Sequence, residues 1–260
     1  MRLLPFLFFF LVATAGATTP AEIRDAFSDE VARQVDVPED VARDYLEKTM
    51  AQLQANGADL TREQFVVSVD RNPAVQTLFV FLGNLSHGYY FIGAGAVSTG
   101  SSGRFDHYIT PPGIYDHTVT DYSDFRAEGT KNSNGIRGYG AKGMRIWDLG
   151  WTPAEKGWLK KKTEKGDIRF QLHATDPGVL EPRLGRPDSK GCVRVSAGLN
   201  TFLDKFGVLD WHYEQVNASG KRPWVWRKDR VETGYSGRYL VVLDSGVTSA
   251  PSWASAHTGR

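Results

Sequence analysis

The amino-acid sequence predicts a protein of the α+β class, mainly β with peripheral helices. Apolar residues at helical spacing are confined to a stretch before residue 60 and a short segment near residue 200. Most of the remainder consists of β-branched and aromatic runs separated by turn residues, and the chain holds 27 Gly and 12% aromatic residues. At 260 residues the chain is long enough for one large domain with appendages.

The N-terminus resembles an export signal. Arg2 precedes an apolar run from Leu3 to Ala13, and Ala15-Gly16-Ala17 has the small-x-small pattern that signal peptidase cleaves. We therefore expect residues 1–17 to be a signal peptide and the protein to be exported to the periplasm or cell envelope. A leader that stayed uncleaved would instead tether the domain to a membrane.

Residues 18–60 are predicted to be an N-terminal helical segment. Thr19 can cap a helix that starts at Pro20, and apolar residues follow at helical spacing. A second helix is expected from Pro38 to Gly57, because apolar residues lie along one side and glycine is a common helix stop. We expect the two helices to form a hairpin packed on the main domain, with a partner-binding module as the alternative.

The main domain is expected over residues 62–216. Three apolar runs, at 65–72, 75–82 and 88–100, predict an antiparallel meander. A further strand is expected at 114–119, and alternation resumes at 144–151. The polar, glycine-rich stretch 121–143 between them is long enough to be a lid over a binding site.

After residue 195 the pattern becomes helical and then mixed. Ser196 can cap a helix that Gly207 ends, and residues 208–226 contain strand-like pieces. Arg238 to Asp244 predicts a late strand. We expect residues 217–260 to be a C-terminal extension that ends in a loose tail.

Cys192 and His173 are the candidate catalytic pair. Ile168, Phe170 and Leu172 alternate as in a strand, which places His173 at a strand end on the opposite face from Leu172. The loop between the pair is rich in Pro and Gly, so it can return the chain to the imidazole. A solitary cysteine is more often a small buried hydrophobe, but an exported protein with one Cys has no internal disulfide partner.

The neighbours of Cys192 favour a nucleophile. Gly191 lacks a Cβ and lets backbone amides turn toward one point, as an oxyanion hole requires. Lys190, Arg194 and Arg186 are close in sequence, and cationic groups lower the pKa of a thiol.

These residues resemble the active-site signature of the L,D-transpeptidase catalytic domain family, the YkuD family. The signature has a His, a loop, and Ser/Thr-His-Gly-Cys followed by an apolar residue and often Arg; this chain has His173 and Ser189-Lys190-Gly191-Cys192-Val193-Arg194. Lys190 replaces the second histidine. The resemblance covers about residues 65–213 and includes three earlier motifs: Val69-Asp70-Arg71, Ser98-Thr99-Gly100 and Thr110-Pro111-Pro112-Gly113.

The resemblance implies a YkuD-like β-sandwich and a role for each site residue. His173 would be the base, Cys192 the nucleophile, the Ala174 carbonyl the group that orients the imidazole, and the Gly191 amide an oxyanion donor. The candidate substrate-binding residues are Arg194, Ser189, Lys190, Tyr139 and Trp147. Arg194 could instead hold the loop, and Trp147 could instead belong to the packed core.

The implied substrate is a peptidoglycan stem peptide. A tetrapeptide stem ending in D-Ala would be cut after the L-centre of its diamino acid, and a neighbouring stem would accept the acyl group in a 3-3 cross-link. If water accepts it, the site is an L,D-carboxypeptidase or endopeptidase. A catalytically silent wall-binding module is the alternative from another class.

Other function classes find no support in the sequence. The net charge is +1, which gives no footprint for nucleic acid. Neither nucleotide-binding glycine motifs nor metal-ligand spacings such as HExxH or CxxC occur. We therefore expect no cofactor, no metal, no nucleotide and no nucleic acid, and a monomeric protein.

Overall fold

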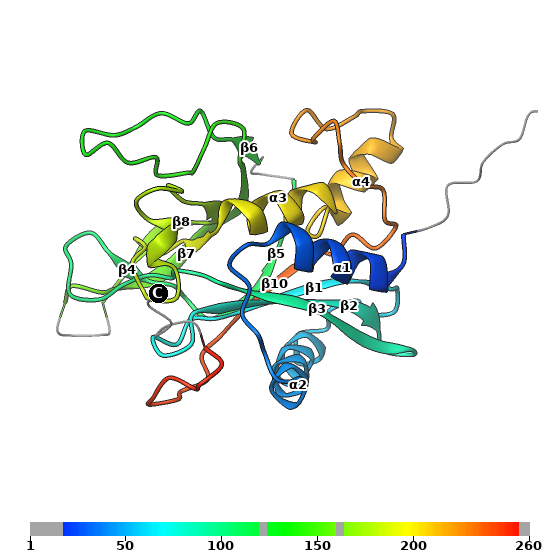
Figure 1. The fold of residues 1–260 in the computed structure, drawn as a ribbon, viewed down its shortest axis with the longest axis horizontal. Coiled ribbons are helices and arrows are strands. Elements are labelled where there is room, and N and C mark those ends of the chain that lie inside the picture. The colour runs from blue at the N-terminus through cyan, green and yellow to red at the C-terminus, as the bar shows by residue number, and fades with distance from the viewer. Residues whose placement is uncertain (1–17, 120–123, 160–163, 255–260) are drawn as a thin grey trace, which may run out of the picture.

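A computed structural model describes residues 18–119, 124–159 and 164–254. These residues form two β-sheets with helices around them, which confirms the predicted α+β class (Figure 1). The predicted signal peptide at 1–17 lies outside the described residues. Within the described part of the chain, no helix has both the length and the apolar character needed to cross a membrane.

The first sheet contains the predicted meander. Its strands are β1 (Gln64–Asp70), β2 (Thr77–Asn84), β3 (Gly88–Ala96), β5 (Gly113–Asp116) and β10 (Tyr239–Leu243). Strands β1, β2 and β3 pair antiparallel in succession, as the sequence predicted, and the full order is β3-β2-β1-β10-β5.

Strand β10 corrects the predicted domain boundary. It pairs parallel with β1 and antiparallel with β5, so it lies inside the first sheet. Every residue of β10 is buried. The predicted division of the chain at residue 217 is therefore wrong, because the late strand completes the main sheet instead of forming an extension.

The second sheet carries the candidate catalytic residues. Its strands are β4 (Tyr108–Ile109), β6 (Phe125–Arg126), β7 (Arg145–Lys156), β8 (Lys165–Ala174) and β9 (Val193–Val195). The order is β4-β7-β8-β9, and β6 pairs with β7. Strands β8 and β9 are parallel, and the chain between them includes a short 3-10 turn at Glu181–Arg183.

The main hydrophobic core lies between the two sheets. Alternate residues of β1 and β2, such as Val67 and Val80, face Phe170 and Leu172 of the second sheet within one buried cluster. Trp147 belongs to the same cluster and has 0% of its surface exposed. Its predicted substrate contact is therefore wrong, because its side chain points into the core and fills it.

The two N-terminal helices flank the first sheet on opposite faces. They are α1 (Pro20–Glu30) and α2 (Glu39–Ala55), and Thr19 forms the capping box of α1 with Glu22. Helix α1 packs into the core between the sheets through Phe27, whereas α2 packs against the outer face through Tyr45 (Figure 1). Both helices pack on the main domain as predicted, but they do not form the predicted hairpin, because the first sheet separates their apolar faces.

Two further helices follow the cysteine. Helix α3 (Ala197–Lys205) begins at the predicted cap, where Ser196 accepts a hydrogen bond from the Leu199 amide. The strand-like pieces expected after residue 208 are wrong in part, because residues 211–218 form helix α4 (Trp211–Ala218). Val208 and Leu209 are buried in a turn before it, so burial explains their apolar character without a strand.

A buried ionic network holds the start of β7. Arg145 is fully buried, and its guanidinium lies 2.8 Å from Asp124, 3.2 Å from Asp204 and 2.6 Å from Asp210. The His117 ring contacts Asp124 through Nε2 at 2.8 Å. These charges are out of water, so each depends on the others for compensation.

Candidate active site

The register of β8 and β9 places His173 on the outward face of the second sheet, and Cys192 directly precedes β9. Leu172 pairs with Val193 and both face the core, so His173 and Arg194, the next pair along, face outward. Cys192 lies in the bend directly before β9, and its sulfur lies 3.7 Å from the carbonyl oxygen of Arg169 on β8. The thiol therefore lies against the strand that carries His173.

The His173 ring is fixed by a backbone carbonyl. Its Nδ1 lies 2.6 Å from the carbonyl oxygen of Ala174, the contact that the resemblance implied. A carbonyl only accepts, so Nδ1 carries the proton and Nε2 is the acceptor nitrogen. Burial lowers the pKa of His173 to about 4, against the opposing effect of the Ala174 carbonyl, and the Arg194 charge lowers it further. The imidazole is therefore neutral near pH 7.

Tyr139 covers the histidine. Its ring meets the His173 ring edge-on at 4.8 Å between centroids, and its hydroxyl donates to Gln171 Oε1 at 3.0 Å. It comes from the loop at 127–143, which the sequence predicted as a lid, and the Arg137 amide anchors this loop to Asp176 at 2.9 Å. Tyr139 also lines a pocket of about 590 Å³ formed by residues 125–140, and its substrate contact stays a prediction.

The loop before Cys192 is built around the Ser189 hydroxyl. This hydroxyl donates to the Cys192 carbonyl at 2.6 Å and accepts the Gly191 amide at 3.0 Å. Ser189 is completely buried, so its predicted substrate contact is wrong and its role is to shape the loop. The Gly191 amide points at Ser189 in this conformation, so the oxyanion role predicted for it requires that hydrogen bond to be exchanged.

Glycine is required at position 191 by two features. Its φ of +131° lies in a region that residues with a Cβ rarely adopt, and a Cβ there would lie 2.7 Å from the Ile168 side chain. The loop can therefore approach strand β8 closely only without a side chain at this position.

The early sequence motifs form a frame around the cysteine loop. The Thr99 carbonyl accepts the Ser189 amide at 2.9 Å, and Ser98 exchanges two backbone hydrogen bonds with Arg194, each 2.9 Å. The Thr110 hydroxyl donates to the Gly191 carbonyl at 2.7 Å. Segments far apart in sequence thus converge on one loop.

Burial dominates the protonation of Cys192. It raises the pKa of the thiol to about 11, although a backbone hydrogen bond from Gln171 and the charge of Arg194 act in the opposite direction. The predicted lowering of the thiol pKa is therefore wrong in this state. Lys190 contributes little, because its ammonium forms an exposed ion pair with Asp106 at 2.6 Å.

This arrangement predicts how the thiol reacts with alkylating agents. Because the pKa of Cys192 is about 11 and that of His173 about 4, thiol and imidazole are both neutral near pH 7. The rate of Cys192 alkylation by iodoacetamide should therefore rise about tenfold per pH unit between roughly pH 7 and 9. Intact-mass measurements over time give this rate, with free cysteine as the control. A rate that is constant over this range would instead indicate a preformed thiolate and imidazolium pair.

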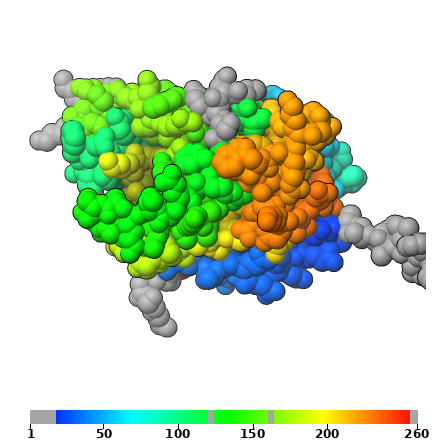
Figure 2. All heavy atoms as spheres, turned by 90° about the horizontal axis from the view of Figure 1, so that it is seen from above, coloured from blue at the N-terminus to red at the C-terminus, as the bar shows by residue number. Residues whose placement is uncertain are grey.

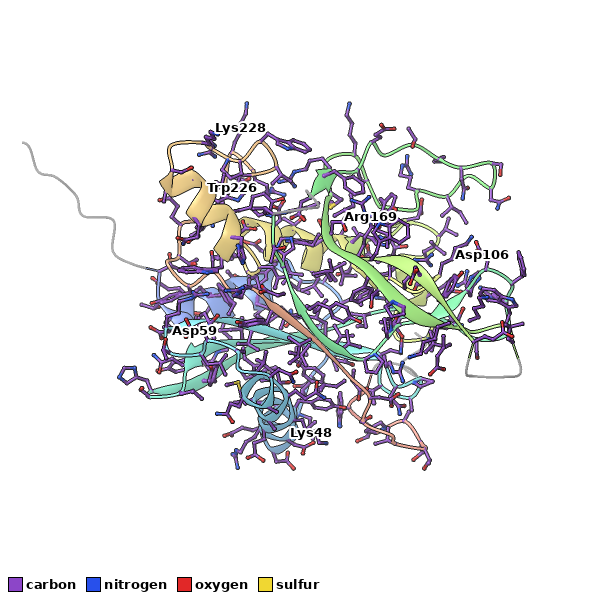
Figure 3. All side chains as sticks on the ribbon, turned by 180° about the vertical axis from the view of Figure 1, so that it is seen from behind. Lys48, Asp59, Asp106, Arg169, Trp226 and Lys228 are labelled. Atoms are coloured by element: carbon purple, nitrogen blue, oxygen red, sulfur yellow. The ribbon has the colours of Figure 1, made fainter. Side chains whose placement is uncertain are left out.

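Several residues of the cleft escaped the sequence analysis. Arg169 and Gln171 alternate with His173 on β8 and so share its outward face, a pattern that the alternation at 168–172 already contained. Arg169 pairs with Asp148 at 2.5 Å, and its carbonyl oxygen lies 3.7 Å from the Cys192 sulfur. In Figure 3, Arg169 lies on the second sheet and Asp106 toward the end of the molecule near β4.

The surface is hollowed above the cysteine loop. Figure 2 shows yellow residues near position 190 as the floor of this hollow, between the green loop 127–143 and the teal residues near 100–110. Trp151, which pairs with Arg169 across the strands, is 58% exposed. Among residues 18–119, 124–159 and 164–254, no group of three or more His, Cys, Asp or Glu side chains is arranged to hold a metal ion.

Comparisons with known proteins add little to this geometry. No known family model matches the sequence, and no curated protein matches it. Among solved structures, a fused Zn-dependent amidase/peptidase/peptidoglycan-binding domain-containing protein from Clostridium acetobutylicum ATCC 824 is similar at a TM-score of 0.31 and 11% identity. The match covers 82% of this chain and 66% of that one, just under two thirds of its length. A likeness this low carries no statement about chemistry.

Proposed function

We propose that this protein is an exported, YkuD-like L,D-transpeptidase that transfers peptidoglycan stem peptides through a thioester on Cys192. The observation that carries the proposal is that the Cys192 sulfur lies against β8, 3.7 Å from the Arg169 carbonyl oxygen, while the same strand carries His173 with its imidazole held by the Ala174 carbonyl. A cysteine beside an oriented base is the arrangement that nucleophilic acyl transfer requires. Cys192 is partly exposed, and the surface is hollowed over the residues near position 190, which supports access of a peptide to the thiol.

The first half of the reaction forms the thioester. His173 Nε2 takes the proton of the thiol while Sγ attacks the carbonyl carbon of the stem's diamino acid. Backbone amides would stabilise the tetrahedral oxyanion, at about 3 kcal/mol for each donor. The C–N bond then breaks, and the imidazolium gives its proton to the departing amine of D-Ala.

The second half releases the acyl group. The side-chain amine of a neighbouring stem attacks the thioester, His173 removes a proton from the attacking nitrogen, and the sulfur leaves and regains its proton. If water attacks, the product is a free acid and the protein is an L,D-carboxypeptidase, or an endopeptidase where the bond cut is a cross-link. Whether transfer to the amine or hydrolysis dominates depends on how well the bound acceptor excludes water.

The two neutral partners favour proton transfer during attack over a preformed ion pair. Bound substrate would favour this proton transfer, because it fills the cleft over His173 and removes water from around the Cys192 sulfur. Tyr139 is placed to assist, since its ring already covers the imidazole.

The proposal is tested with tetrapeptide muropeptides and mass spectrometry. Residues 18–260 and the Cys192→Ala variant are incubated separately with the substrate. We expect dimers linked between diamino acids, or tripeptides if water competes, from the unmodified protein, and neither product from the variant. Products from both proteins would exclude the thiol as nucleophile. The absence of dimers and tripeptides with both proteins would support a wall-binding module.

A further inference from the structure

Three arginines converge on Asp188, next to the cysteine loop. Arg104 and Arg183 approach the same carboxylate oxygen at 2.8 and 2.9 Å, and Arg194 donates to the Asp188 backbone carbonyl at 2.9 Å. Only 6% of Asp188 is exposed. The arginines come from the loop before β4, the 3-10 turn and β9, so the fold assembles the cluster from three distant segments.

The cluster has more positive than negative charge. Two guanidinium groups share the Asp188 carboxylate and a third binds its backbone carbonyl, so three positive charges face one negative charge at this point. Nearby cations do not add to the excess, because Arg169 pairs with Asp148 and Lys190 with Asp106. Like charges held together repel, so this arrangement favours the arrival of an anion.

Arg194 has a donor that no protein group uses. Its Nε atom is buried and has no hydrogen-bond partner among the residues that the structure describes. A buried guanidinium N–H without a partner has lost its hydrogen bonds to water, and no protein hydrogen bond offsets this desolvation cost. A ligand with acceptor oxygens would satisfy this donor.

The cluster is close to the nucleophile. Arg194 follows Cys192 by two residues, a separation of about 6.6 Å along an extended chain. The Arg194 charge acts on both Cys192 and His173, which also places it beside the reacting groups. A group bound here would lie within about one residue of the carbonyl that Cys192 attacks.

We propose that Arg194, with Arg104 and Arg183, binds the free C-terminal carboxylate of the stem peptide, on the residue that leaves when Cys192 attacks. This inference rests on the proposed function and assigns that site's selectivity for stems with an uncapped terminal residue. Guanidinium groups bind carboxylates through charge-assisted, often bidentate hydrogen bonds. Asp188 holds Arg104 and Arg183 in place and is a positioning residue.

The test compares two peptides that differ only at the C-terminus. One tetrapeptide stem ends in D-alanine carboxylate and the other in D-alanine carboxamide, so internal carboxylates are identical. Binding to the Cys192→Ala protein is measured by calorimetry, and cleavage by the unmodified protein is measured in parallel. We expect the carboxylate peptide to bind about 10- to 100-fold more tightly, as for a hydrogen bond to a charged group.

Two substitutions locate the effect. Arg104→Gln and Arg183→Gln, each made in the Cys192→Ala protein, should remove most of the preference while leaving binding of the amide peptide unchanged. Both side chains are partly exposed, and each variant leaves Asp188 one ion pair, so both should fold. Arg43→Gln is the matched control, because Arg43 is an exposed arginine in an ion pair on α2.

The outcomes separate this inference from the proposed function. Equal binding of the two peptides, failure of both to bind, or equal losses for both peptides in the arginine variants would overturn the carboxylate site. Preferential binding of the carboxylate without any cleavage by the unmodified protein would retain the site and reject the transpeptidase. Cleavage of both peptides at equal rates and with equal affinity would retain the proposed enzymatic function and reject the carboxylate site.

Discussion

Replacing His173 by glutamine is expected to lower kcat/KM for stem peptides by about 10²- to 10⁴-fold, the usual contribution of a general base. Glutamine keeps an amide that can donate to the Ala174 carbonyl, so the local hydrogen bond survives. It has no basic nitrogen to accept the thiol proton. Because the pKa of Cys192 is raised to about 11, the thiol has little thiolate of its own near pH 7, and the loss should be large.

The histidine variant has a matched control in His107→Gln. The His107 ring also lies within hydrogen-bond distance of a backbone carbonyl, that of Phe105 at 3.0 Å, but it belongs to the loop before β4. We expect His107→Gln to retain nearly full kcat/KM. Activity of His173→Gln should partly recover at high pH, where hydroxide replaces the base. Equal activity of the two variants at neutral pH would show that His173 is not the base.

Replacing Arg145 by methionine is expected to destabilise the fold by about 3–5 kcal/mol, the cost of removing one partner from a buried ionic group. Methionine fills much of the space but removes the guanidinium that Asp124, Asp204 and Asp210 share, so Asp204 keeps only Arg126 and Asp210 only Arg230 as cationic partners. His117 can compensate only in part, because its ring reaches Asp124 alone among these acids. Urea unfolding followed by circular dichroism measures the change.

The control for this loss is Arg43→Met. Arg43 pairs with Glu39 on the exposed side of α2, with 62% of its side chain exposed, and such a surface pair contributes about 0–1 kcal/mol. If Arg145→Met unfolded at the same urea concentration as Arg43→Met, the buried network would contribute nothing net to stability.

The sequence allowed the strands to be predicted better than their arrangement. Runs such as 75–82 have β-branched and aromatic residues bounded by turn residues, and these local signals predicted β2 correctly. The position of β10 had no local signal, since parallel pairing with β1 depends on contacts across some 175 residues of sequence. The same limit explains the helices α1 and α2, whose apolar stripes predict burial but not which face of the sheet they cover.

The sequence also predicts some residues of the candidate site and misses others. Local pattern and resemblance predicted His173, Cys192 and the Ala174 carbonyl, and of these the structure shows the contact between His173 and the Ala174 carbonyl. The pKa of the thiol could not be predicted, because sequence proximity of Lys190 says nothing about its ion pair with Asp106. Arg104 and Arg183 could not be assigned either, since only the folded chain brings them to Asp188.

The interior place of β10 has a consequence for biogenesis. The first sheet lacks the strand that joins β1 to β5 until residue 243 has been synthesised. A polypeptide that stops before residue 239 would leave open edges on β1 and β5 that can pair with other chains. Translation products shortened in this way are therefore expected to aggregate.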